Sequence, residues 1–168
     1  MTLSMYAASV PVFKQILGSL SDIIDKAEAH AIAKKIDPNA LLQARLFPDM
    51  FPFMRQIMIA TDFAKSTSAR LAGIDVPKYE DAEQNFADLK ARIAKTLAFI
   101  DTVTPAQIDG SEARDISTSA GPNSKNFKGQ SYLLNYALPQ FFFHATTAYA
   151  ILRHNGVEIG KRDFIGKY

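Results

Sequence analysis

One of the three histidines in this sequence lies where an imidazole could take part in chemistry. His144 falls within the nearly uncharged stretch from Tyr132 to Asn155, and Gln140 precedes it by one helical turn. An imidazole in such surroundings can ligate a metal ion, transfer a proton, or satisfy a hydrogen bond inside the core. We favour the third interpretation, with the amide of Gln140 or Gln56 as hydrogen-bond partner, and the other two stay open.

Other kinds of site find little support in the sequence. The chain has no cysteine, which excludes disulfides, thiolate zinc sites, iron–sulfur clusters and cysteine nucleophiles. Serine, histidine and aspartate are present, but in no nucleophile-elbow pattern. The segment from Gly121 to Gly129 lacks the preceding strand and the G-K-[ST] of a phosphate-binding loop. The formal net charge is +2 and the charges are scattered, so we expect no nucleic-acid partner.

The stretch that carries His144 has the length and composition of one long helix. One face would hold the histidine among apolar residues, and aromatic residues occupy the other faces. The first face contains Ala137, Phe141, His144, Ala148 and Leu152, and the others carry Phe142, Phe143, Tyr149 and Ile151. A helix that is apolar nearly all round is central in a protein or packs against a second chain. We therefore predict the innermost helix here, and a homodimer, because three neighbouring helices would not cover every face.

Three more amphipathic helices are predicted from apolar residues spaced three and four apart. They cover residues 3–34, 50–72 and 82–103, and the helix with the histidine covers 131–155. The first helix has two alternatives: a start after a Ser9 cap, or, as we favour, a start near Leu3 with a kink at Pro11. Asp81 is the predicted cap of the third helix, whose outer face would carry Lys90, Arg92 and Lys95.

The segment from Gly110 to Gly129 is of low hydrophobicity. Gly121-Pro122-Asn123 is a strong turn signal, and Ile116 and Phe127 on either side of it allow a small β-hairpin. A connection of this length inside a compact domain usually crosses over the structure or covers a site.

Together these patterns predict one all-α domain over residues 1–168, a four-helix bundle with a long crossover before its last helix. Ser131 caps that last helix, and Phe164 and Ile165 in the tail should pack onto the bundle. No uncharged apolar run reaches the length of about 18 residues that a membrane span needs, and the first residues lack the pattern of a signal peptide. We expect a cytoplasmic protein with no membrane partner.

Three segments carry a resemblance to a known family. They are MYAASVPVFKQIL at the start, FPFMRQIMIATDFAK in the middle, and LPQFFFHATTAYAILRHNGVEIGKRDFIG near the end. The chain resembles the uncharacterised bacterial family called domain of unknown function 1993, within the DinB/YfiT-like metalloenzyme superfamily. The resemblance implies a DinB-like four-helix bundle, a homodimer, and a divalent metal held by three histidines. One of these comes from the second helix and two come from an H-x-x-x-H pair on the fourth.

The match to that ligand set is partial. His144 corresponds to the second histidine of the pair, and Gln140 stands where the first would be. No histidine occupies the second-helix position; Gln56 is the best candidate for it, and Asp62 the weaker one. One imidazole and two amides make a poor site for zinc or nickel, which take imidazole, thiolate or carboxylate ligands.

We therefore expect a small-ligand-binding or structural homodimer with a degenerate metal site, whose pocket includes Gln56, Gln140 and His144. The alternative is a metal-dependent enzyme, of the thiol-dependent transferase or isomerase type found among relatives, that uses zinc or nickel at a weakened site around His144. A third alternative is an interaction module without a pocket.

Overall fold

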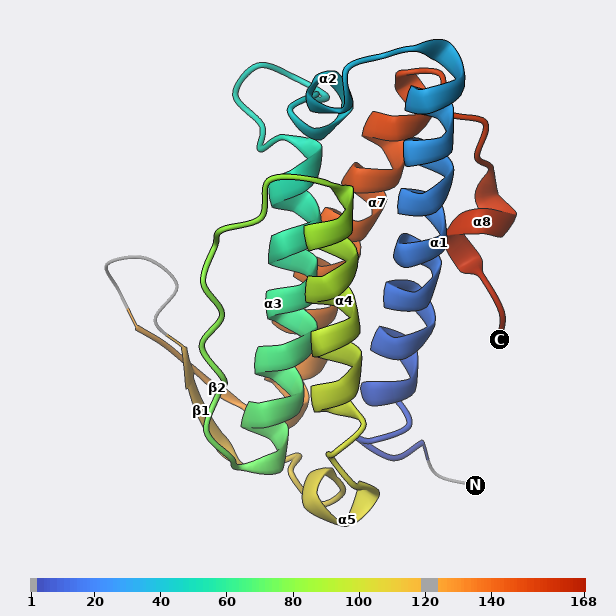
Figure 1. Ribbon diagram of the computed structural model, residues 1–168. Helices are drawn as coiled ribbons and strands as arrows, with labels where there is room; N and C mark the ends of the chain where they lie inside the picture. The colour runs from blue at the N-terminus through green and yellow to red at the C-terminus, as the bar shows by residue number, and fades with distance from the viewer. Residues whose placement is uncertain (1–2, 119–123) are drawn as a thin grey trace.

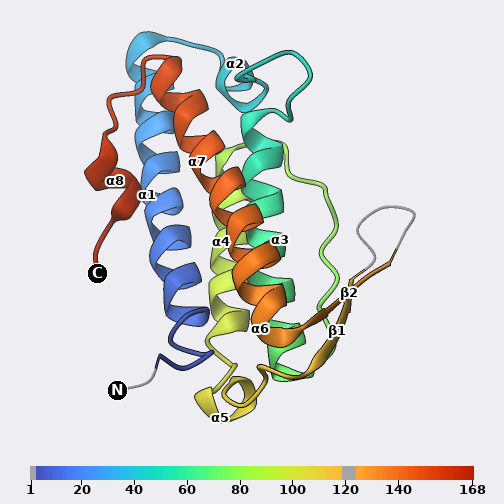
Figure 2. The ribbon, with the colours of Figure 1, turned by 180° about the vertical axis from the view of Figure 1, so that it is seen from behind.

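Four long helices lie side by side in the structure, a computed structural model that describes residues 3–118 and 124–168. They are α1 (Val10–Lys34), α3 (Phe53–Ala72), α4 (Phe86–Ile100) and α7 (Leu138–His154). α3 packs against α4 and α7, and α1 packs against the same two helices, so the four enclose a common core (Figures 1 and 2). Fully buried large side chains fill this core, among them Phe13, Leu17, Phe53 and Phe141.

Short elements connect and extend the long helices. They are α2 (Pro38–Leu42), α5 (Pro105–Ile108), α6 (Gly129–Tyr132), the π-helical turn η1 (Leu133–Ala137) and α8 (Lys161–Ile165). α6 and η1 lead directly into α7, so the chain is helical from Gly129 to His154. The last helix thus begins before Ser131, and this residue lies inside α6 instead of capping it.

An antiparallel hairpin of β1 (Asp115–Thr118) and β2 (Lys125–Lys128) is present within the described residues. Ile116 pairs with Phe127, as the sequence allowed. The fold is therefore mostly helical with a small two-stranded sheet, and the prediction of an all-α fold is wrong in this respect. The pair is stabilised by packing: Ile116 is buried, and the Phe127 ring stacks on Tyr136 with centroids 5.1 Å apart. The predicted turn Gly121-Pro122-Asn123 lies outside the described residues.

The first helix begins at Val10, not near Leu3. Pro11 has no backbone N–H, which prevents a regular helix from running through it from the preceding turn. Residues 5–9 form turns, and the Ser9 hydroxyl donates to the Met5 carbonyl at 2.7 Å. The start is therefore that of the Ser9–Pro11 alternative, but the Ser9 side chain does not cap the helix.

Two other predicted helix starts are also too early, while the ends of α1 and α3 agree with the sequence. α3 begins at Phe53 after Pro52, later than residue 50, and stops at Gly73, whose φ of 71° suits glycine. α4 begins at Phe86, later than residue 82. Asn85 is its cap and accepts a hydrogen bond from the Asp88 amide at 2.9 Å.

The residues between α3 and α4, 74–85, contain neither helix nor strand and are called the strap below. The strap runs along α3 on the side of the hairpin (Figures 1 and 2). Asp81 lies in it and forms an ion pair with Arg55, so it does not cap α4. Arg92 was predicted on the outer face of the third helix; it is instead only 4% exposed, because it faces α3 and the strap.

The helix that carries His144 contains an irregular turn for a local reason. Pro139 lacks an amide hydrogen and its ring conflicts with the carbonyl one turn earlier, and the wider π-helical turn η1 comes directly before α7. The predicted inner face is confirmed, since Ala137, Phe141, His144, Ala148 and Leu152 are all buried. The helix is not covered on every side, however, because Phe143 is 54% exposed.

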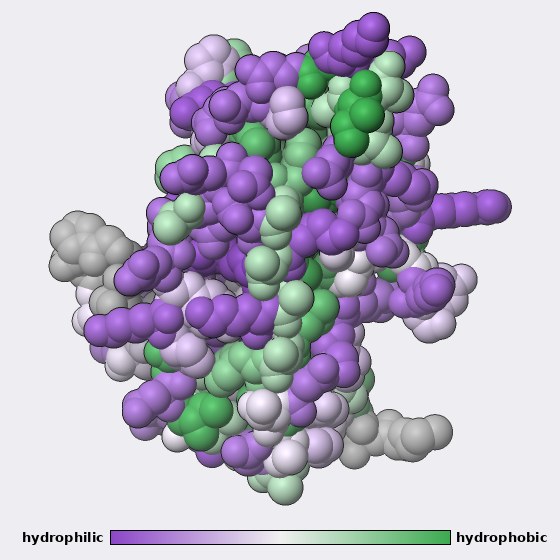
Figure 3. All heavy atoms as spheres, viewed as in Figure 1, coloured by the Kyte–Doolittle hydropathy of each residue, from purple (hydrophilic) through white to green (hydrophobic). Residues whose placement is uncertain are grey.

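Figure 3 shows hydrophilic residues over most of this face, with hydrophobic residues exposed in a broken band that runs down its middle. No helix in the described part of the chain is both long enough and apolar enough to cross a membrane.

The tail packs onto the body, as predicted. The Phe164 ring lies 5.7 Å from that of Tyr149 on α7, and the Ile165 carbonyl accepts a hydrogen bond from Gln15 Nε2 on α1 at 2.9 Å. Asp163 pairs with Lys26 at 2.6 Å, although this exposed ion pair contributes little to stability.

Deleting residues 161–168 should lower the melting temperature by several degrees. Full burial of a large apolar side chain stabilises by about 1.5–3 kcal/mol, and Phe164 and Ile165 are partly buried, so part of this is lost. Thermal unfolding followed by circular dichroism measures the effect. Removal of Lys167 and Tyr168 alone, both exposed, is the control and should leave the melting curve in place.

Candidate functional site

Side chains from α3 meet side chains from the α6–η1–α7 helix in three successive pairs. The pairs are Gln56 with His144 at 2.7 Å, Phe63 with Tyr136 at 5.9 Å between ring centroids, and Arg70 with the Tyr132 hydroxyl at 3.0 Å. The three α3 residues are spaced by two turns each, so they share one face of the helix. On this face, two polar pairs and one aromatic pair join α3 to the last helix.

His144 is held as a neutral imidazole. Gln56 Nε2 donates to the Phe51 carbonyl at 2.9 Å, which leaves Gln56 Oε1 as the acceptor for the N–H of His144 Nδ1. Burial, and secondarily the positive charge of Arg55, lowers the pKa of His144 from 6.5 to about 4. The ring lies nearly parallel to that of Phe63, with centroids 6.1 Å apart. At neutral pH the group therefore acts as a hydrogen-bonding residue without charge.

The hydrogen bond expected for His144 is present, and of the two candidate amides, Gln140 and Gln56, its partner is Gln56. Gln140 is half-buried one turn earlier on α7, and no hydrogen bond joins it to His144. Asp62, the weaker candidate for the second-helix position, is taken up by ion pairs with Lys65 at 2.7 Å and Arg92 at 2.9 Å. Within residues 3–118 and 124–168, no three side chains of the His, Asp or Glu type come together as a metal site. The donors beside His144 therefore do not fit zinc or nickel.

A cavity of about 770 Å³ adjoins this face of α3. α3 forms its floor through Arg55, Phe63 and Arg70 among others, the strap forms one wall, and Thr118 of β1 and Tyr136 of η1 form another. The cavity reaches His144 indirectly, because Phe63 lies against the imidazole and also lines the cavity. None of Gln56, Gln140 and His144 lines it, so their contact with a ligand stays a prediction.

Arg92 holds the strap in place. Its guanidinium donates to Thr61 at 2.9 Å, Asp62 at 2.9 Å, Glu83 at 2.8 Å and the Glu80 carbonyl at 3.1 Å. Burial opposes its charge, but Glu83, Asp62 and Asp81 together raise the pKa of Arg92, so it stays protonated. A buried guanidinium needs such partners, and they come from both α3 and the strap.

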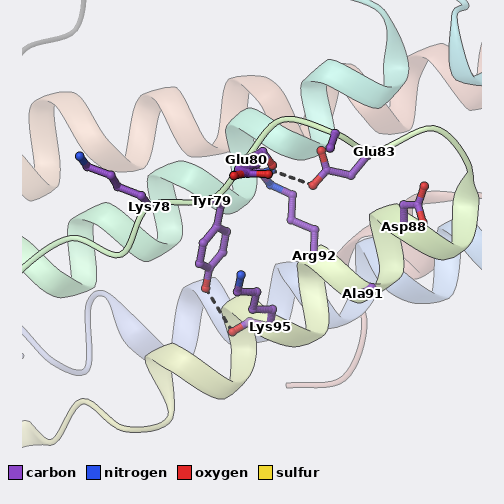
Figure 4. Close-up of a pocket in the computed structure, with 9 residues that line it drawn as sticks. Lys78, Tyr79, Glu80, Glu83, Asp88, Ala91, Arg92 and Lys95 are labelled. Carbon is purple, nitrogen blue, oxygen red and sulfur yellow. Dashed lines mark hydrogen bonds and ion pairs between the residues drawn. The ribbon is translucent and has the colours of Figure 1, made fainter.

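Tyr79 of the strap lies among positive charges. Lys65 Nζ is 3.9 Å and Lys95 Nζ 4.2 Å from its ring centroid, and its hydroxyl donates to the Lys95 carbonyl at 3.3 Å. Figure 4 shows Tyr79 reaching from the strap towards Lys95, with Arg92 pointing to Glu83 beside it. Tyr79, Glu83, Arg92 and Lys95 line a second cavity of about 530 Å³. Tyr79 lines both cavities.

Sequence reasoning missed Arg92, Tyr79 and Arg70. A signal for Arg92 existed: it stands three residues after Leu89 and four before Thr96, on the buried face of α4. The acidic residues of the strap could have suggested its partners. Nothing local marks Arg70, because its role depends on Tyr132, which is distant in sequence.

Comparisons with known proteins agree over nearly the whole chain. The model of a family described as "Domain of unknown function (DUF1993)" matches residues 5–165. The crystal structure of a DinB family member protein from Shewanella denitrificans is similar to this one, with a TM-score of 0.91 and 41% sequence identity. The similarity covers 97% of this chain and 92% of that one. No curated protein matches.

His144 should make stability depend on pH in a defined window. Because its pKa falls from 6.5 to about 4 on folding, the unfolded chain binds a proton between these values that the folded protein does not. The contribution of neutral His144 to the free energy of unfolding is therefore complete above pH 6.5. It is lost as the pH falls towards 4, by at most about 1.4 kcal/mol per pH unit.

Urea unfolding at a series of pH values measures the slope of the unfolding free energy against pH. His144→Gln should flatten this slope between pH 6.5 and 4. His154→Gln removes an exposed imidazole from the same helix and should leave the slope in place. Equal slopes in wild type and His144→Gln would contradict the assignment.

Proposed function

The chain belongs to the family described as domain of unknown function DUF1993, and on that premise we propose that it is a DinB-like four-helix bundle that binds a small molecule. The site is the cavity between α3, the strap and the hairpin, and it works without a transition metal. The neutral His144–Gln56 pair supports it from behind Phe63.

The cavity is the observation that carries this proposal. Its volume of about 770 Å³ is of the size that takes a small organic ligand. Its lining combines aromatic and apolar side chains, such as Phe63, Val76 and Tyr136, with a few charged groups that can orient a ligand. Its walls come from separate parts of the chain, so the cavity exists only in the folded protein.

We include Gln56, Gln140 and His144 in the site, as the sequence suggested. His144 Nε2 is the free acceptor of the ring once Nδ1 donates to Gln56, and Gln140 supplies a half-buried amide on the same side of α7. A ligand that displaced Phe63 would reach the His144 imidazole, against which Phe63 lies. Their role is hydrogen bonding to a neutral part of the ligand, since neither carries charge at neutral pH.

The alternative is a metal-dependent enzyme that uses zinc or nickel at His144. The donor set argues against it, because His144 commits Nδ1 to Gln56, the two neighbouring glutamines are amides, and Asp62 is paired with two cations. A single imidazole nitrogen with neutral amide oxygens is a weak site for these metals.

Native mass spectrometry of protein purified without a histidine tag tests the two functions. We expect no stoichiometric zinc, nickel or iron. If the protein retains a ligand through purification, its native mass should increase by the mass of that ligand. A stoichiometric metal that disappears in His144→Ala, but not in His154→Ala, would overturn the proposal in favour of the enzyme.

We also propose that the protein is a homodimer that uses the outer face of α7. Phe143 is 54% exposed, and Leu134 of η1 is 46% exposed on the same continuous helix. Phe51, just before α3, is a further large apolar side chain that is 53% exposed. A specific interface buries about 1,200 Å² or more in total, so these side chains would form the apolar centre of a larger contact.

Light scattering should give about twice the chain mass of 18.5 kDa. Phe143→Glu should shift the protein towards the monomer, since it places a charge in the apolar contact. Ile74→Glu changes an exposed apolar residue at the opposite end of α3 and should leave the mass unchanged. A wild-type mass of 18.5 kDa at every concentration over a hundredfold range would contradict the dimer.

A further inference from the structure

The cavity beside α3 carries an excess of positive charge. Four cationic side chains line it, Arg55, Lys65, Arg70 and Lys78, against two acidic ones, Asp62 and Asp81. The cavity is thus biased towards anions, although the whole chain is nearly neutral with a formal charge of +2.

The two acidic groups are already neutralised by the protein. Asp62 lies 2.7 Å from Lys65 Nζ and 2.9 Å from Arg92, and Asp81 pairs with Arg55 and lies 3.3 Å from Arg92. Arg92 does not line this cavity, and its charge reaches both carboxylates from the interior. Lys65 and Arg55 are therefore balanced, and the uncompensated charge belongs to the other two cations.

Those two cations are Arg70 and Lys78. In the described part of the chain neither has a carboxylate within ion-pair distance. Arg70 is half-buried, and one of its nitrogens donates to the Tyr132 hydroxyl at 3.0 Å, which orients the guanidinium. The remaining N–H groups are those that can form a paired contact with a carboxylate.

Aromatic and hydroxyl groups complete the lining. Phe63 and Tyr136 contact each other edge to face and present apolar surface, and Ser66 and Thr118 add hydroxyl groups. Burial, with Tyr132 as a further cause, raises the pKa of Tyr136, so its phenol remains a hydrogen-bond donor. An apolar body and an anionic group would each meet matching surface here.

We propose that the ligand of this cavity is a small aromatic carboxylate, whose carboxylate binds Arg70 and Lys78 and whose ring packs against Phe63 and Tyr136. This inference rests on the proposed function and names the chemical class of its ligand. A phosphate fits less well, because Arg70 lies in the last turn of α3, where the helix dipole is negative. This dipole disfavours a doubly charged anion more than a singly charged carboxylate.

Nuclear magnetic resonance titrations with three probes test the inference: sodium benzoate, its neutral analogue benzamide, and inorganic phosphate. Benzoate should shift the amide signals of Ser66, Arg70, Thr118 and Tyr136, and its Kd should be about tenfold below that of benzamide. Phosphate should bind more weakly than benzoate. Arg70→Gln should raise the benzoate Kd by about tenfold while leaving that of benzamide unchanged.

Two lysine variants complete the test. Lys78→Gln removes an exposed cation from the cavity and should weaken the binding of benzoate severalfold. Lys167→Gln, in the tail on the far side of the molecule, should leave the benzoate Kd unchanged (Figure 1). If Arg70→Gln melts early, because Tyr132 loses its partner, Lys78→Gln decides the question.

The outcomes separate the inference from the proposed function. If benzamide binds in the cavity as tightly as benzoate, the inference of a carboxylate ligand is wrong, while the proposed binding of small molecules remains supported. If phosphate binds more tightly than benzoate, the inference of an aromatic carboxylate is likewise wrong. No shift of the cavity signals with any probe at about 10 mM would contradict the proposed function as well.

Discussion

The structure around the cavity depends on the burial of one charged group, the guanidinium of Arg92. An unpaired charge in the interior would be strongly destabilising, so the guanidinium must be surrounded by acceptors. Its partners come from two places: Thr61 and Asp62 on α3, and Glu80, Asp81 and Glu83 in the strap. A segment without helix or strand is thereby fixed along α3 by a charge from α4.

The same contacts set the electrostatics of the cavity. Because Arg92 shares Asp62 and Asp81 with Lys65 and Arg55, the carboxylates of the lining are occupied, and Arg70 and Lys78 keep their charge available. An interaction whose first effect is structural therefore also sets the charge balance of the cavity lining. Tyr79, held between Lys65 and Lys95, gives the strap a second attachment.

The opposite wall depends on a backbone constraint. Pro139 is preceded by the π-helical turn η1, and Tyr136 within that turn contacts Phe63 on α3 and Phe127 of the hairpin. One aromatic residue thus connects the helices to the only strands in the described part of the chain. The hairpin and the strap are the two segments that distinguish this site from the bare surface of α3.

The sequence by itself determined the long helices, the inner face of the last one, the burial of His144 and the packing of the tail. These follow from local patterns, since apolar spacing and proline or glycine positions act within a few residues of one another. Only the tertiary structure decided that Gln56 and not Gln140 binds His144, because a residue on the facing helix can meet the ring nitrogen directly. It also decided which partners surround the buried Arg92 and that Arg70 borders a cavity, since both depend on contacts with other elements that no local spacing encodes.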